Sequence, residues 1–179
     1  MKNLQSLLVL SILAVFCTAC PYTSPFMAGT PVVADNVWNG QWVHHFTNND
    51  STTTSSQMTF RVRNEDEMFL STKLSLFPNV QPERRNMKAF LRKIGTTQLL
   101  LVYPLTQNTG KLFTYYKLHM PSADSLELHA LDEHKVPDTL HTRLMLENWL
   151  LHHAAADSLW EEPHLFTRPI VAITADVQR

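Results

Sequence analysis

Glycine is scarce in this sequence, and no pattern typical of a catalytic site is present. Four glycines are spread over 179 residues. A phosphate-binding loop needs glycines close together, because its backbone amides approach the phosphates closely. The sequence therefore argues against nucleotide hydrolysis and dinucleotide binding. Neither G-x-S-x-G nor H-E-x-x-H occurs, so we expect no catalytic residue, no metal and no cofactor.

The chain also lacks an excess of charge of either sign. Lys and Arg together number 15, and Asp and Glu number 16. No basic block occurs along the chain. Because nucleic-acid binding usually requires a concentrated positive surface, we expect no nucleic-acid partner.

Cysteine is restricted to two positions, Cys17 and Cys20, which follow an apolar run from Leu4 to Phe16. The run is too short for a membrane span of about 20 residues. A positive start at Lys2, a short apolar core and small residues after it are typical of a secretory signal peptide, here residues 1–19. No cysteine follows Cys20, so an oxidising compartment offers it no disulfide partner in the mature chain.

The stretch Cys17-Thr18-Ala19-Cys20 resembles the lipobox of bacterial lipoproteins. In that family the consensus is leucine, a small residue, alanine or glycine, and then the cysteine that becomes lipidated. Cys20 matches the modified position, whereas Cys17 stands where the family usually has leucine. The resemblance implies a protein of the bacterial cell envelope, anchored in a membrane through lipidated Cys20 and facing the periplasm.

Residues 20–36 contain prolines and small polar residues without periodicity. This composition predicts a flexible tether after the lipidated cysteine. Residues 37–179 then form a single domain, which the length permits.

Alternation of apolar and polar residues dominates this domain up to residue 131. In 57–63, for example, Met58, Phe60 and Val62 share one face, as expected for a half-buried strand. The seven predicted strands lie in 40–46, 57–63, 67–77, 86–94, 97–105, 111–120 and 125–131. A helix is predicted over about 137–155, with Pro137 and Asp138 in its first turn. A closing strand follows in 163–174, where Pro169 predicts an edge or a bulge.

The segment Gly40-Gln41-Trp42 resembles the Gly-x-Trp signature near the start of the first strand in lipocalin-like barrels. In that family the tryptophan closes one end of the barrel, an arginine packs on it, and a helix lies outside. Arg168 is the candidate for that arginine. The resemblance implies a mainly β antiparallel barrel with structural roles for Gly40 and Trp42. A curved sheet or sandwich packed on the helix is the alternative fold.

Histidine is the one unusual component, with seven of nine lying between His119 and His164. His129, Asp132, Glu133 and His134 lie close together in the sequence, and His141 and His152 would share one face of the predicted helix. Structural or solvated histidines are one interpretation, and a metal site the other.

Three functions are compatible with these features. The leading one is a non-catalytic lipoprotein that binds a small apolar ligand in a β-barrel. The second is an assembly module that docks on envelope proteins through a sheet edge or helix. The third is a metal-binding or hydrolytic enzyme that uses the histidines. An apolar cavity in the barrel would favour the first, and convergent ligands the third.

Overall fold

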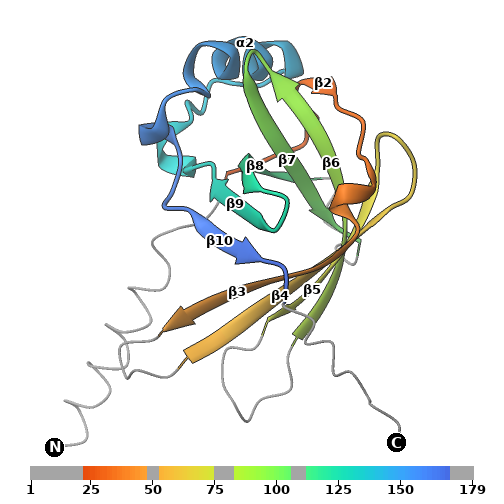
Figure 1. Cartoon of the computed structure of the whole chain (residues 1–179). Helices are drawn as coiled ribbons and strands as arrows, with labels where there is room; N and C mark the ends of the chain where they lie inside the picture. Colours follow the sequence, from red (N-terminus) through yellow and green to blue (C-terminus); the bar gives the residue numbers. More distant parts are fainter. Residues whose placement is uncertain (1–21, 48–52, 75–82, 106–111, 170–179) are drawn as a thin grey trace, which may run out of the picture.

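The computed structural model describes residues 22–47, 53–74, 83–105 and 112–169 (Figure 1). Cys20 lies outside the described residues. The strands are β1 (Thr23–Ser24), β2 (Thr30–Pro31), β3 (Gly40–Thr47), β4 (Thr53–Val62), β5 (Met68–Leu74), β6 (Glu83–Ile94), β7 (Thr97–Pro104), β8 (Phe113–Ser122), β9 (Ser125–Ala130) and β10 (His164–Thr167). The helices are α2 (Arg143–His153) and the short 3-10 turns η1 (Asn36–Trp38), η2 (Glu133–Lys135) and η3 (Asp157–Leu159).

Strands β3 to β10 form a closed antiparallel barrel. Each strand from β3 to β9 pairs with the next one in the chain, and β10 pairs with both β9 and β3. The open sheet and the sandwich are therefore wrong, and the barrel expected from the sequence is confirmed. The seven predicted strands correspond to β3 to β9.

The barrel interior is built by the alternating apolar residues that the sequence pattern identified. Met58 and Phe60 of β4 are 7% and 0% exposed, and Leu70 of the neighbouring β5 is 2% exposed. These inward-facing side chains belong to one buried cluster together with Trp42, Leu100, Leu118, Leu126 and Phe166. The two-residue alternation thus separates the side chains that point into the barrel from those that point outward.

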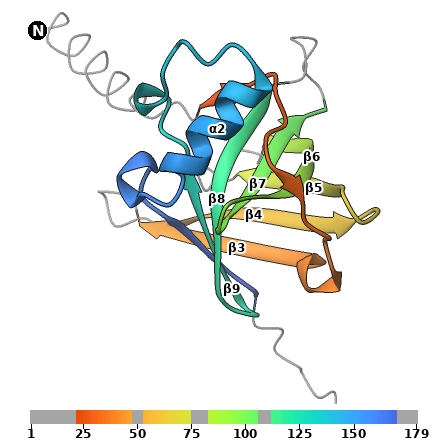
Figure 2. The same cartoon turned by 90° about the horizontal axis from the view of Figure 1, so that it is seen from above.

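A second core lies outside the barrel, between α2 and strands β6 to β8 (Figure 2). Leu146 and Leu150 of α2 are fully buried there, against Leu99 and Leu101 of β7. Because Leu100 and Val102 of the same strand face the interior, β7 is buried on both sides. This explains why its sequence is a continuous apolar run rather than an alternating one.

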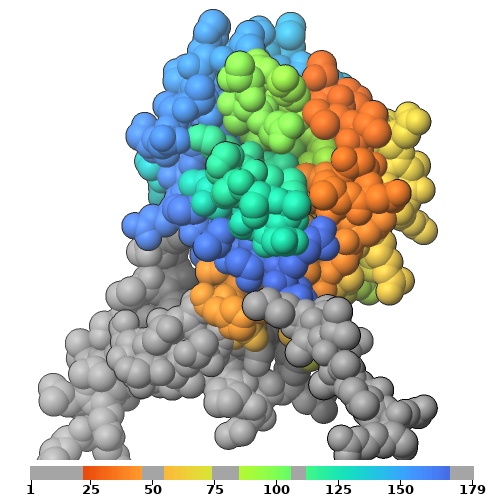
Figure 3. Space-filling view, in the orientation of Figure 1, coloured from red at the N-terminus to blue at the C-terminus, as the bar shows by residue number. Residues whose placement is uncertain are grey.

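Residues 22–34 are an ordered part of the domain, so the prediction of a tether over 20–36 is wrong for this segment, which we call the strap. Its strands β1 and β2 pair with β8 and β6. Figure 3 shows the strap, in orange, packed into the same surface as β6 in green. Ala28 is fully buried in the outer core, and its backbone amide donates to the Tyr115 hydroxyl over 3.1 Å. The Tyr115 hydroxyl in turn donates to the carbonyl of Phe26.

Two further hydrogen bonds attach the strap at points distant in sequence. The Gly29 amide donates to Glu147 Oε1 over 2.9 Å, which joins the strap to α2. Gly29 has a φ of 91°, a conformation that favours glycine. The Tyr22 amide donates to the Leu131 carbonyl over 2.8 Å. Isolated anchor residues leave no periodicity, which is why the sequence pattern resembled a linker.

The helix begins later than predicted. The expected span was 137–155 with Pro137 and Asp138 in the first turn, but α2 begins at Arg143. Thr142 is its N-cap, and the Thr142 hydroxyl accepts a hydrogen bond from the Met145 amide over 3.2 Å. His141 therefore precedes the helix and shares no helical face with His152.

The closing strand β10 is shorter than predicted, and it is not an edge strand. It pairs on both sides and ends at Thr167, two residues before Pro169. Pro169 thus ends the pairing rather than placing the strand at an edge. The predicted continuation from residue 170 onward lies outside the described residues. Within the described part of the chain, no helix has the length and apolar character needed to cross a membrane.

Candidate functional site

The barrel interior contains an apolar cavity of about 620 Å³. Its wall is mostly apolar and is formed by residues from all eight strands of the barrel, including Met58, Leu70, Met87, Leu100, Val102 and Leu128. The cavity lies toward the end of the barrel where β3, β5 and β7 finish. The partly exposed Ser56 and Thr72 and the exposed His164 are at this end. Its volume is within the range of about 300–1,000 Å³ that small-molecule sites have.

The other end of the barrel is filled by side chains. Trp42 of β3 is fully buried, and Trp38 of η1 is only 5% exposed. The Trp38 and Phe60 rings meet edge to face, with centroids 5.8 Å apart. Trp38 lies just outside β3, and η1 turns its side chain back onto the same core as Trp42.

Arg168 packs on Trp42, as the resemblance to lipocalin-like barrels implied. Its guanidinium carbon lies 4.4 Å from the centroid of the Trp42 ring, a cation–π contact. Nη1 also donates to the Asn39 carbonyl over 3.1 Å, and Nε donates to the Ala123 carbonyl over 3.2 Å. Arg168 thereby joins the start of β3 to the turn between β8 and β9.

Gly40 allows this approach of Arg168. Its φ is 123°, which favours glycine. A Cβ atom at this position would lie 2.9 Å from Arg168 Nη1. Gly40 is therefore needed both for the backbone conformation and for space beside the arginine.

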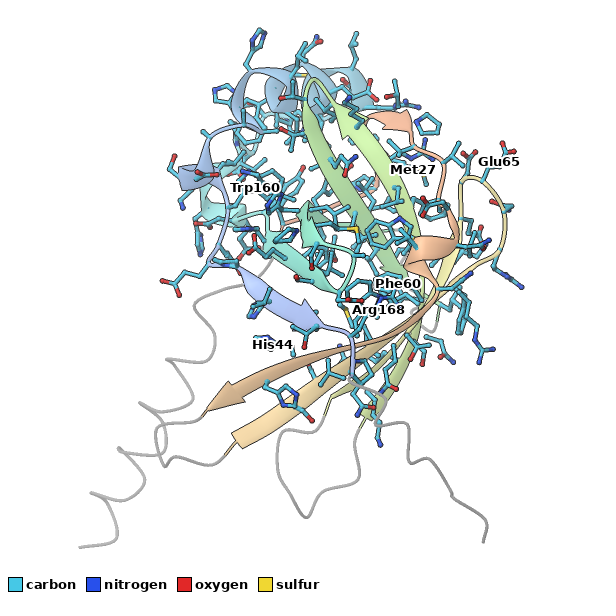
Figure 4. All side chains as sticks on the ribbon, in the orientation of Figure 1. Met27, His44, Phe60, Glu65, Trp160 and Arg168 are labelled. Carbon is cyan, nitrogen blue, oxygen red and sulfur yellow. The ribbon has the colours of Figure 1, made fainter. Side chains whose placement is uncertain are left out.

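Most polar groups of the cavity lie on one wall, where β10 and β9 meet β3 and β8. His44 Nδ1 lies 2.7 Å from the Leu165 carbonyl oxygen, which requires Nδ1 to carry the proton in this contact. The His44 ring meets the His164 ring edge to face, with centroids 5.2 Å apart. Figure 4 shows His44 beside β10. Tyr116 and Glu161 line the same wall.

Burial and neighbouring groups shift the pKa values of three side chains at this wall toward their uncharged forms. Desolvation lowers the pKa of His164, and the nearby His44 and His129 lower it further, so His164 is neutral at pH 7. Burial raises the pKa of Glu161 above its usual range, and Asp132 and Glu133 raise it further. Loss of contact with water raises the pKa of Tyr116, with Glu161 adding to the effect. Tyr116 therefore stays protonated and can donate a hydrogen bond.

The histidine-rich cluster predicted from the sequence has a structural arrangement. Asp132 is the N-cap of η2, and its Oδ1 accepts from the His134 amide over 3.0 Å. Asp132 Oδ2 lies 2.9 Å from Lys135 Nζ, and this contact is the main reason that the pKa of Asp132 is lowered. In the described ranges, no group of three or more His, Cys, Asp or Glu side chains could hold a metal ion.

His44 follows Trp42 by two positions in β3 and lies on the same, inward-facing side of the strand. The sequence patterns did not identify Glu161, His164 or Tyr116 as its neighbours. Glu161 follows η3, which no sequence pattern indicated, and it reaches the cavity because its amide bonds to the Ala130 carbonyl over 2.8 Å. Such contacts between distant segments have no local sequence signal.

Comparison with protein-family models and with curated proteins finds no match. Among solved structures, the chain is similar to a redesigned β-barrel. The TM-score is 0.44 at 13% identity, over 77% of this chain and 96% of that one. The strand pairing described above, and not this likeness, establishes the barrel.

Proposed function

We propose that the protein binds a small apolar molecule in the barrel cavity and performs no catalysis. The observation that carries the proposal is the combination of a plugged end with a hollow, apolar other end. Eight-stranded barrels either fill their interior with side chains or hold one small ligand. The small residues Ser56, Thr72 and Ala130 on the wall leave the space that larger side chains would fill.

A fluorescence titration with N-phenyl-1-naphthylamine, an uncharged apolar probe, tests this proposal. We expect saturable binding of about one probe per chain, because the cavity suits one small molecule. Replacing Thr72 by tryptophan should fill part of the cavity and weaken binding at least about tenfold, a loss of about 1.4 kcal/mol.

The matched control is Ser71→Trp on the same strand. Ser71 lies on the outer face of the barrel beside Gln57 and Thr59, so this variant should bind the probe as the unchanged protein does. Ala130→Trp provides a second blocked cavity from β9, on the opposite wall. Equal binding by all four proteins would contradict a site inside the barrel.

We further propose that Cys20 is lipidated and anchors the protein in the bacterial cell envelope. The lipobox-like residues support this, and attachment by more than one acyl chain would give a stable anchor. The strap makes the consequence specific. The Tyr22 amide is bonded to the Leu131 carbonyl, and two residues of extended chain span at most about 7 Å. The barrel would therefore lie directly against the bilayer rather than at the end of a tether.

Mass spectrometry of the mature N-terminus tests the anchor. We expect the chain to start at Cys20 and to carry the added mass of acyl chains. Cys20→Ala should abolish this processing. An unmodified Cys20, or a different first residue in the mature chain, would rule the assignment out.

The assembly-module alternative has one feature in its favour. Leu144 and Leu151 of α2 are 66% and 55% exposed, and seven positions apart they lie on one side of the helix. Docking through α2 would not account for the hollow interior, however. Ligand binding accounts for it directly, and for this reason it is the function we favour.

A further inference from the structure

The cavity has a polar wall without a cationic side chain among its described lining residues. The polar wall consists of His44, Tyr116, Glu161 and His164. Ser56 of β4 and Thr72 of β5 are the other polar lining residues, and the rest of the lining is apolar. Arg85 of β6 shares the inward-facing alternation with Met87, but it is exposed and does not line the cavity. It also lies four strands around the barrel from β10, on the opposite wall.

The carboxylate of Glu161 sets the charge at the polar wall. Two more acidic groups, Asp132 and Glu133, are near enough to raise its pKa. Lys135 acts in the opposite direction, but its Nζ is 2.9 Å from Asp132 Oδ2 and is engaged there. An anionic head group at this wall would meet negative charge, and no cationic side chain among the described lining residues would compensate it.

The same wall is well suited to an uncharged head group that donates and accepts hydrogen bonds. His164 is a neutral imidazole at pH 7, which offers one donor and one acceptor. The protonated Tyr116 hydroxyl and the Glu161 carboxylate add a donor and an acceptor. These groups lie at one side of a mostly apolar space, so a ligand would place its head here and its tail against Leu70, Met87 and Leu100.

We infer that the cavity selects neutral amphiphiles, molecules with an alkyl tail and an uncharged hydroxyl or amide head, and discriminates against the carboxylate of a free fatty acid. This inference rests on the proposed function and names the ligand class for the same site. Glu161 is the residue that determines the preference, because it excludes an anion while accepting a hydrogen bond from a hydroxyl.

A competition experiment at pH 8 tests the inference. N-phenyl-1-naphthylamine is bound first and is then displaced by 1-dodecanol or by sodium dodecanoate, which share one chain length. We expect dodecanol to displace the probe at a concentration at least about tenfold lower. Equal displacement, or a preference for dodecanoate, would overturn the inference while leaving ligand binding intact. Failure of the probe to bind at all would overturn the proposed function and the inference with it.

Glu161→Gln removes the charge and keeps the shape of the side chain. This variant should bind dodecanoate several-fold more tightly and dodecanol within about twofold of the unchanged protein. Glu162→Gln, at the exposed neighbouring position outside the cavity lining, is the matched control and should change neither. If dodecanoate binds Glu161→Gln no better than the unchanged protein, Glu161 does not determine the preference and the inference fails.

Discussion

Replacing Trp42 by alanine is expected to lower the free energy of unfolding by about 3–5 kcal/mol, as removal of a large buried aromatic side chain does. Trp42 is fully buried at the plugged end of the barrel, and its ring carries the Arg168 guanidinium. The expected loss is a large part of a typical stability of about 5–15 kcal/mol. Urea unfolding followed by circular dichroism measures it without relying on tryptophan fluorescence.

Trp42→Phe is the control, since it keeps an aromatic face for Arg168 and most of the buried volume. The indole Nε1 of Trp42 has no hydrogen-bond partner among the described residues, so phenylalanine loses no hydrogen bond there. We expect this variant to lose clearly less stability than Trp42→Ala. A loss below about 1 kcal/mol for Trp42→Ala would show that Trp42 does not close the barrel.

Removal of the strap is the second change with a large expected effect. A chain that begins at Asp35 should lose at least about 3 kcal/mol of stability, or fail to fold, relative to one that begins at Pro21. Deletion uncovers the apolar outer core around Tyr115, at about 25 cal/mol for each Å² exposed. It also removes the pairing of β1 with β8 and of β2 with β6, and leaves the buried Tyr115 hydroxyl without Phe26.

The two chains are compared by urea unfolding under identical conditions, and both lack Cys20, so lipidation does not affect the comparison. Equal unfolding midpoints would mean that the strap is a tether, as its composition first indicated. Retention of probe binding in the shortened chain would show, separately, that the barrel interior forms without the strap.

Local patterns predicted the barrel well because strand faces depend on period two alone. Met58 and Phe60 were assigned correctly to one face, and the Gly-x-Trp segment correctly placed Trp42 beside a later arginine. The helix start was wrong because Pro137 and Asp138 are good first-turn residues, yet the Thr142 hydroxyl caps α2. Both signals are local, and the sequence alone does not show which of them determines the first residue of the helix.

The remaining features depend on contacts between distant segments. The strap is ordered by single residues such as Ala28, which packs beside Tyr115, 87 positions away. The polar wall combines His44 with His164, from strands that meet only when the barrel closes. The cavity itself forms because small residues such as Thr72 and Ala130 lie opposite each other. The order of the strands around the barrel determines this arrangement.

The most direct test of the hollow barrel is the position of a bound ligand. A crystal of the protein soaked with 12-bromododecan-1-ol allows the bromine to be located by its anomalous scattering. With the hydroxyl at Glu161 and His164, we expect one bromine site inside the barrel, within the space lined by Met58, Leu70 and Leu100. A bromine site on the outer surface beside α2, or an interior that stays without bromine at saturating ligand, would contradict the account.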